Sequence, residues 1–366
     1  MARRAYIDWA RGLAVLIMMQ WHGVDAWVRP ADRASRGFGY LGIIGGAAAP
    51  LFLWLAGLAV VMALEKTASR GTTRWAAAMT GVRRGFQIFG LAFVFRAQSF
   101  VLSPFKPIVS LLRVDILNVL GLGIAAAAAV WALGRHAVGA VVLGAVVATA
   151  IAFSTPVIRT AAWLPALPSV VQWYLTQHPL SKFTLLPWAG FVFAGVVCGT
   201  WIWHGARSST SVGPDSPAPV VDDGRVMGLM AIGGAALTGV SWWASFQPSI
   251  YSPPASFWST SPTYFGLRVG LMMMTLAALW VCVPLARRVP APFTVLERLG
   301  RDSLFIYWIH VELVYGYLTW PLHRRLPVWG ALMAWILLSF AMFRALDVRD
   351  RWLARWLARW HEHQST

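Results

Sequence analysis

Long apolar segments follow one another along almost the whole of this chain. Divided at charged residues and at Pro and Gly clusters, they number about ten, and each approaches the roughly 20 residues that a helix needs to cross a bilayer. Helices satisfy their own backbone groups within lipid, so the pattern predicts an all-α, polytopic membrane protein with about ten transmembrane helices. The predicted spans are residues 5–28, 39–64, 75–101, 111–133, 137–157, 183–204, 226–246, 264–286, 299–320 and 327–346.

Composition excludes a water-soluble domain. Only 12% of the residues are charged, about half the share of a soluble domain, and 58% are hydrophobic. The net charge of +17 would suit a nucleic-acid-binding protein, but the basic residues are scattered over short loops and helix ends, and no nucleic-acid-binding motif is present. We therefore expect membrane lipids, and no nucleic acid, as partners.

The basic residues also predict an orientation, because cytoplasmic loops are enriched in Lys and Arg. Alternate ends of the predicted spans carry most of these residues, which places both termini on the cytoplasmic side. The sequence thus predicts a multi-pass protein of the inner (plasma) membrane. The predicted cytoplasmic residues include Arg3, Arg4, Lys66, Arg70, Arg74, Arg135, Arg207, Arg287 and Arg288.

Two segments depart from the pattern of spans. Residues 205–225, rich in Ser, Pro and Asp, predict a flexible cytoplasmic linker within a single bundle of residues 1–346. Residues 347–366 predict a basic amphipathic tail, in which Arg351, Arg355 and Arg359 recur every four residues beside a parallel stripe of tryptophans. Such a helix is typical of the interface with anionic lipids.

The first predicted span contains ionisable residues, which are costly at membrane depth and therefore usually functional. His22 and Asp25 are three residues apart and share one helix face. A carboxylate beside an imidazole orients the ring and raises its basicity, which suits a general base that takes a proton from a hydroxyl or an amine. A polar pair that bridges helices is the structural alternative. Catalysis also requires that His22 face a hydrated passage.

Further polar residues accompany the predicted spans. Asp8 and Arg11 can pair on the first span, either as a structural ion pair or as part of a site for a polyanionic cosubstrate. Arg113, Asp115 and Asn118 begin the fourth span, and Tyr307 and His310 share a face of the ninth; both groups are candidates for substrate binding. His310 could equally be a satisfied histidine between helices.

Other chemistries leave no trace in the sequence. No metal-ligand spacing and no Gly-x-Ser-x-Gly nucleophile motif is present, so no metal is expected. Cys198 and Cys282 both lie in apolar segments, which favours free, buried thiols over a disulfide.

Several of these residues resemble a known family. Asp8-x-x-Arg11-Gly12 followed by His22 resembles the opening of bacterial membrane acyltransferases. Arg113-x-Asp115-Ile116-Leu117 resembles a segment of the heparan-α-glucosaminide N-acetyltransferase catalytic-domain family, and residues 50–57, 186–191 and 300–310 match in order. The lysosomal branch differs: it has Asn where His22 stands, and its proposed catalytic His lies in the following loop, which here has no His. The role of His22 therefore follows the bacterial members.

The resemblance implies transfer of an acyl group, normally acetyl, from cytosolic acetyl-CoA or another acyl-CoA to a hydroxyl or amine of a sugar or glycan acceptor at the membrane or its outer face. It implies that His22, supported by Asp25, is the base and that Asp8 and Arg11 help to bind the donor. The acceptor would be oriented by the following residues: Arg113, Asp115, Asn118, Tyr307 and His310.

Two other functions remain open at this point. Buried Asp, Arg and His also suit a proton-coupled transporter or flippase of a polar or lipid-linked molecule, although no inverted repeat is evident. A non-catalytic scaffold would not need so many ionisable residues. The sequence leaves the oligomeric state open, a homodimer included.

Overall fold

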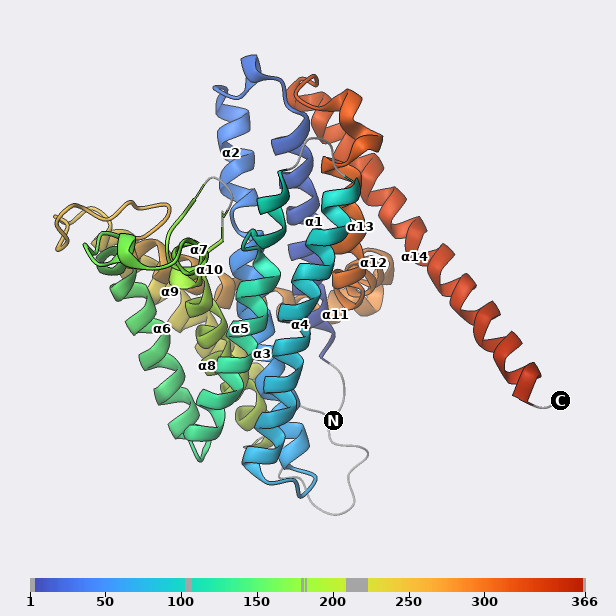
Figure 1. Cartoon of the computed structure of the whole chain (residues 1–366). Helices are drawn as coiled ribbons and strands as arrows, with labels where there is room; N and C mark the ends of the chain where they lie inside the picture. Colours follow the sequence, from blue (N-terminus) through green and yellow to red (C-terminus); the bar gives the residue numbers. More distant parts are fainter. Residues whose placement is uncertain (1–3, 103–106, 179–180, 182, 209–222, 365–366) are drawn as a thin grey trace. The chain divides into compact units, whose positions relative to one another are not determined.

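The computed structural model describes residues 4–102, 107–178, 181, 183–208 and 223–364, and these residues are almost entirely helical. They form two compact units (Figure 1). The first unit comprises residues 1–7, 49–101 and 105–284. The second comprises residues 8–48, 102–104 and 285–366. The first unit therefore includes helices from both sides of the predicted linker, most of which lies outside the described residues.

Within the described residues, eight helical segments are long and apolar enough to cross a membrane, which confirms a polytopic all-α membrane protein. Two of the ten predicted spans are not among them. α1 (Ala5–Trp27) is an unbroken helix of 23 residues, but its ionisable side chains lower its hydropathy. The predicted span 299–320 contains α13 (Ser303–Tyr315), whose 13 residues rise about 20 Å, short of the roughly 30 Å of a hydrocarbon core.

The second predicted span is divided in a way that the sequence did not indicate. Residues 39–64 fall on α2 (Arg36–Gly45) and α3 (Ala48–Ala68), which are separated at residues 46–47. Pro50 lies in the first turn of α3. A missing backbone N–H costs nothing there, because the first turn has no hydrogen-bond acceptor for it.

The first unit is built from long helices that pack side by side. α8 (Leu185–Ser208) packs against α5 (Ile116–Leu133) and α6 (Ala137–Arg159), and α9 (Gly224–Ala244) packs against α10 (Pro262–Val281). The remaining elements of this unit are α3, α4 (Arg74–Leu102) and the short η2 (Ile108–Leu112), η3 (Leu164–Ala166) and α7 (Ser169–Leu175).

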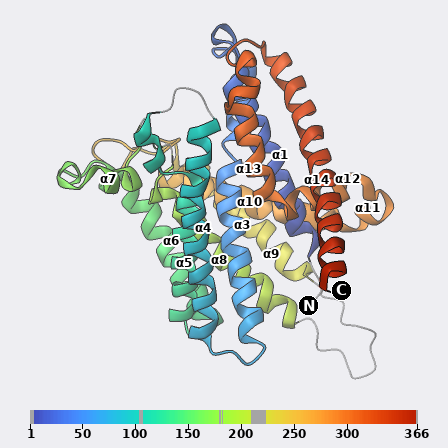
Figure 2. The ribbon, with the colours of Figure 1, turned by 45° about the vertical axis from the view of Figure 1, so that its right-hand side comes forward.

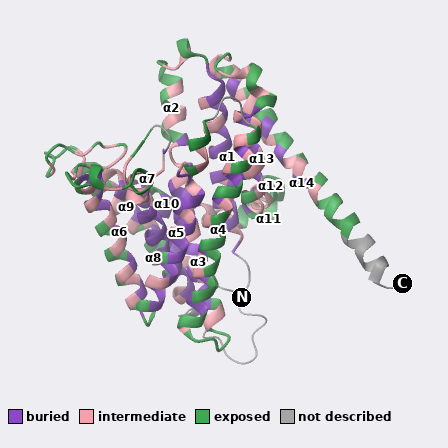
Figure 3. Cartoon of the chain, in the orientation of Figure 1, coloured by how far each residue is buried: buried purple, intermediate pink, exposed green. Residues whose placement is uncertain are grey.

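The core of the first unit lies along α3 and α8, where buried residues concentrate (Figure 3). Gly57 of α3 faces the main-chain carbonyl of Val192, and Gly195 of α8 faces that of Trp54, so the two backbones are in direct contact. Close approach at glycine is the usual way in which membrane helices gain packing energy. α6, by contrast, exposes an apolar stripe, as a face toward lipid requires. The stripe includes Val138, Val142, Val146, Phe153 and Val157.

The second unit brings α1 together with the C-terminal helices. Gly12 of α1 faces the backbone of Leu296 in α12 (Pro290–Arg301), and Gly300 of α12 faces the backbone of Asp8. The end of α1 is bonded to the segment before α14 (Val328–Gln364), since the amide of Leu326 donates to the Trp27 carbonyl at 2.8 Å. The unit also contains α2, α13, η1 (Pro30–Asp32), η4 (Tyr317–Leu322) and most of α11 (Val283–Arg288) (Figure 2).

The predicted amphipathic tail is the continuation of α14, without a break after the last span. Trp352 and Trp356 are exposed on it, as are Arg351 and Arg355. The third repeat, Arg359 and Trp360, lies where no side chain is described.

Candidate active site

Two histidines from distant parts of the chain meet in the second unit. The imidazole ring of His22, on α1, lies edge to edge with that of His310, on α13, with ring centroids 5.1 Å apart and planes inclined by 8°. His22 Nδ1 lies 2.9 Å from His310 Nε2, which is hydrogen-bonding distance. His310 is fully buried and His22 is half-buried. The pair joins residues 288 positions apart, which no periodic pattern can reveal.

The hydrogen bonds assign the protons of this pair. His310 Nδ1 lies 2.7 Å from the Ile306 carbonyl oxygen, which can only accept, so Nδ1 carries the proton. In neutral His310 the other nitrogen, Nε2, is then an acceptor. His22 Nδ1 must therefore donate to it, and the lone pair of neutral His22 lies on Nε2. The arrangement gives His22 the tautomer of a base at Nε2.

Asp25 is not the partner of the imidazole that the sequence predicted. Its carboxylate accepts a hydrogen bond from the Tyr315 hydroxyl at 3.4 Å and lies 3.6 Å from Arg33 Nη1. Arg33 also donates to the main-chain carbonyl of Asp25. Arg33 is a permanent cation with several donors, so it is a stronger partner for a carboxylate than a neutral imidazole. His310 replaces Asp25 as the group that orients His22.

Tyr315 and Arg33 are site residues that sequence analysis missed. The Tyr315 ring meets His22 edge-on at 5.6 Å, and its hydroxyl reaches Asp25, so it connects the imidazole to the Asp25–Arg33 pair. The predicted Tyr307 packs edge-on against His310 at 6.1 Å. Tyr315 lies five residues beyond His310.

His323 lies in the same unit, directly after η4. Burial lowers the pKa of His323, and the positive charges of Arg324 and Arg33 lower it further, whereas Asp25 opposes the shift. This histidine is consequently neutral at neutral pH, and the positive charge near Asp25 comes from arginines.

The predicted pair of Asp8 and Arg11 is present. Arg11 Nη1 lies 3.2 Å from Asp8 Oδ1, and the Asp8 side chain is buried whereas that of Arg11 is 27% exposed. Arg11 precedes His22 by 11 residues on the same unbroken helix, a separation of roughly 16 Å along its axis. α1 thus holds a partly exposed cation near one end and a base toward the other.

Asp115 and Asn118 cap α5 in the first unit. Asp115 accepts from the Ile116 amide at 2.6 Å, while Asn118 Oδ1 accepts from the Asp115 amide at 2.9 Å, which is a capping box. Arg96 pairs with the Asp115 carboxylate, and Arg113, two residues before the cap, is half-buried. The geometry gives Asp115 and Asn118 a structural role as the cap of α5. Their part in acceptor binding stays a prediction.

Both cysteines are free; Cys198 is buried and Cys282 is half-buried. Among the described residues, no three His, Cys, Asp or Glu side chains are grouped so as to hold a metal ion.

The family profile named heparan-alpha-glucosaminide N-acetyltransferase, catalytic, matches residues 3–232, which is more than half of the chain. The chain belongs to this family. Membership identifies a membrane acetyltransferase of a family that acts on glycans. A comparison with curated proteins found no match. The matched region contains His22 and Arg11 but ends before α13, so His310 lies outside it and is connected to it here through its contact with His22.

Proposed function

We propose that the protein transfers an acetyl group from acetyl-CoA to a hydroxyl or amine of a sugar or glycan acceptor, with His22 as the general base. The observation that supports this most strongly is the bonded pair of His22 and His310, because its hydrogen bonds leave the lone pair of His22 on Nε2. A general base must present that lone pair to the nucleophile.

In the proposed reaction, Nε2 of His22 removes the acceptor proton as the oxygen or nitrogen attacks the thioester carbonyl. A new C–O or C–N bond forms, and the C–S bond breaks. The sulfur leaves with the electron pair and takes the proton back from Nε2, so the enzyme ends unchanged. No acyl-enzyme is needed, because donor and acceptor react directly.

His310 and Asp25 act as positioning residues in this proposal. Both nitrogens of buried His310 are engaged, one with the Ile306 carbonyl and one with His22, so it orients the base and does not itself contact the acceptor. Its bond from His22 Nδ1 strengthens when His22 becomes charged. Asp25 holds the hydroxyl of Tyr315, whose ring limits the position of the imidazole.

Arg11 is the proposed contact for the phosphates of the donor. Its side chain is 27% exposed, and its planar guanidinium, which Asp8 holds at one nitrogen, has the donor geometry that matches phosphate oxygens. The extended pantetheine arm of acetyl-CoA has a length of the same order as the roughly 16 Å from Arg11 to His22. We place the protein in the inner membrane, with Arg11 and both termini on the cytoplasmic side.

The test is acetyl transfer from radiolabelled acetyl-CoA to mixed cell-envelope glycans by purified protein. His22→Gln should lower the rate by about 10²–10⁴-fold, the usual contribution of a general base, with an unchanged melting temperature. The control is His136→Asn, which removes an imidazole from the exposed N-cap of α6 but keeps a good capping residue. Near-normal transfer by His22→Gln would remove this residue from the mechanism. Glycan movement without consumption of donor would instead establish a transporter.

A further inference from the structure

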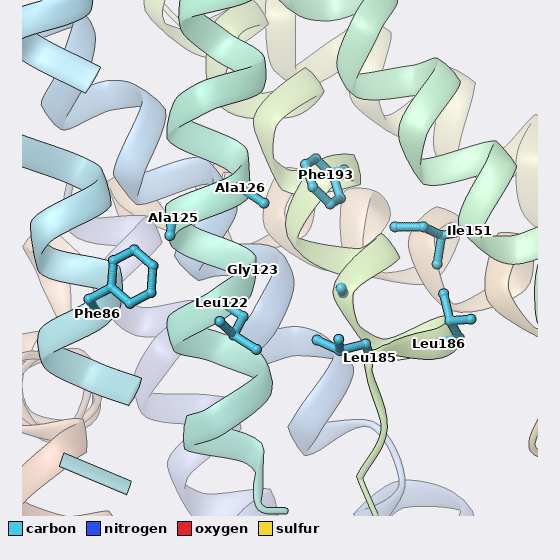
Figure 4. Close-up of a pocket in the computed structure, with 10 residues that line it drawn as sticks. Phe86, Leu122, Gly123, Ala125, Ala126, Ile151, Leu185, Leu186 and Phe193 are labelled. Atoms are coloured by element: carbon cyan, nitrogen blue, oxygen red, sulfur yellow. The ribbon is translucent and has the colours of Figure 1, made fainter. Parts of the chain in front are cut away.

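An apolar groove of about 490 Å³ opens in the first unit between α4, α5, α6 and α8 (Figure 4). Its lining is made only of Phe, Leu, Ile, Ala and Gly, and includes Phe86, Leu122, Ala126, Ile151 and Leu186. The volume is in the range of small-molecule sites, yet no side chain of the lining can donate or accept a hydrogen bond. Such a groove suits a hydrocarbon chain rather than a sugar or a nucleotide.

A cation lies at one end of this groove. Arg159, the last residue of α6, donates through Nη2 to the carbonyl of Leu186, a lining residue, at 2.6 Å and to the Thr184 hydroxyl at 2.7 Å. Nη1 lies 3.4 Å from the Ser259 carbonyl. These partners are all neutral. In the part of the chain that the structure describes, no carboxylate pairs with Arg159, and its buried Nε has no hydrogen-bond partner.

The positions of cation and groove match the two parts of a membrane lipid. Arg159 ends the candidate span Ala137–Arg159, where a lipid headgroup would lie. Ile151 precedes it by eight residues on the same helix, so the groove at that level is about 12 Å deeper. A charge at the headgroup level above an apolar groove is complementary to a phosphate above an acyl chain.

We propose that this groove holds an acyl chain of an anionic phospholipid and that Arg159 binds the phosphate of its headgroup. A guanidinium forms charge-assisted hydrogen bonds with phosphate oxygens, and its charge would be neutralised by the ligand. The site is independent of acetyl transfer. A lipid could therefore bind here even if the proposed reaction proved wrong.

The test measures lipids that stay bound to the purified full-length protein, by native mass spectrometry from micelles with equal amounts of phosphatidylglycerol and phosphatidylcholine. The wild-type protein should retain phosphatidylglycerol preferentially. Arg159→Gln should lower its retention roughly tenfold or more, as expected for a lost charge-assisted hydrogen bond, and Arg159→Lys should lose less. Arg70→Gln removes the same charge from an exposed position and should change nothing.

A second pair of variants tests the groove itself. Ala126 is exposed and lines the groove, so Ala126→Phe should fill it and reduce retention of both lipids without unfolding the protein. Ala145→Phe, on the exposed face of α6 outside the groove, is the matched control.

The proposal is overturned by equal retention of both lipids by the wild-type protein, or by equal effects of a variant and its control. Full displacement of phosphatidylglycerol by glycerol 3-phosphate, which has no acyl chain, would also overturn it, because the groove would then contribute nothing.

Discussion

His310→Leu is the change that most directly tests the paired histidines. Leucine places an apolar side chain at this fully buried position and removes the acceptor for His22 Nδ1. A hydrogen bond between neutral groups contributes about 1 kcal/mol and a charge-assisted one about 1.5–3 kcal/mol. The bond gains that difference as His22 takes the proton, so its loss raises the barrier by about 0.5–2 kcal/mol, or roughly 2- to 30-fold in kcat.

The tautomer adds to this effect. Without an acceptor beside Nδ1, part of the His22 population carries its proton on Nε2 and cannot act as the base there. The expected loss in kcat for His310→Leu therefore lies between that roughly 2- to 30-fold effect and the full 10²–10⁴-fold contribution of a general base. The KM for acetyl-CoA should stay unchanged, because His310 is buried and bonded on both nitrogens.

The assay is steady-state transfer from radiolabelled acetyl-CoA, with kcat and KM determined separately and the melting temperature measured beside them. His310→Gln is the matched variant, because its amide oxygen can accept from His22 Nδ1, and it should recover most of kcat. The reasoning fails if His310→Leu retains wild-type kcat, if Gln is as damaging as Leu, or if only KM changes.

Three further changes test other parts of the structure. Arg11→Gln should raise the KM for acetyl-CoA roughly tenfold with little change in kcat, as for a lost charged contact with phosphate, whereas a fall in kcat alone would contradict donor binding. Gly12→Val should lower the free energy of unfolding by about 1–3 kcal/mol in denaturant titrations, since its Cβ would meet the carbonyl of Leu296, while Gly39→Ala, in open space, should not. Asp115→Ala should lower the free energy of unfolding by about 0.5–2 kcal/mol through the lost cap and further through loss of the ion pair with Arg96, whereas Asp115→Asn keeps the cap and should lose only the ion pair; a rise in acceptor KM in both variants would instead show acceptor binding.

The sequence predicted the helical membrane architecture well, because apolarity over about 20 residues is a local property. It failed where apolarity continues past the end of a helix. Apolar residues continue beyond Tyr315, as Tyr317, Leu318 and Trp320, yet α13 ends before Gly316, whose backbone turns to an extended conformation, φ −87° and ψ −175°. An added Cβ at Gly316 would meet the carbonyl of Glu312 and, at 3.1 Å, that of Leu102, so the chain here passes close to a residue distant in sequence.

The site was predictable only in its local parts. Asp8 and Arg11 pair because residues three apart on one helix are neighbours, whatever surrounds them. The same rule failed for His22 and Asp25, because helical spacing does not take account of residues outside the helix. Arg33 follows the end of α1 and lies close to the Asp25 carboxylate. Helical spacing also cannot show that His310 contacts His22. The sequence therefore indicated His310 as a candidate site residue, but not its proposed role of orienting the base.

In the proposed reaction, the local geometry of the two rings indicates which of them acts as the base. The Ile306 carbonyl accepts the backbone amide of His310 in the α-helix and has a second lone pair, which the Nδ1 proton of the same residue uses at 2.7 Å. The fully buried side chain of His310 has no water to compete for that proton. Its Nε2 is then committed as an acceptor, and the half-buried ring of His22 must turn its own Nδ1 proton inward. In the proposed reaction, a buried histidine bonded to its own helix thus leaves the outer ring, His22, as the one that takes a proton from the acceptor.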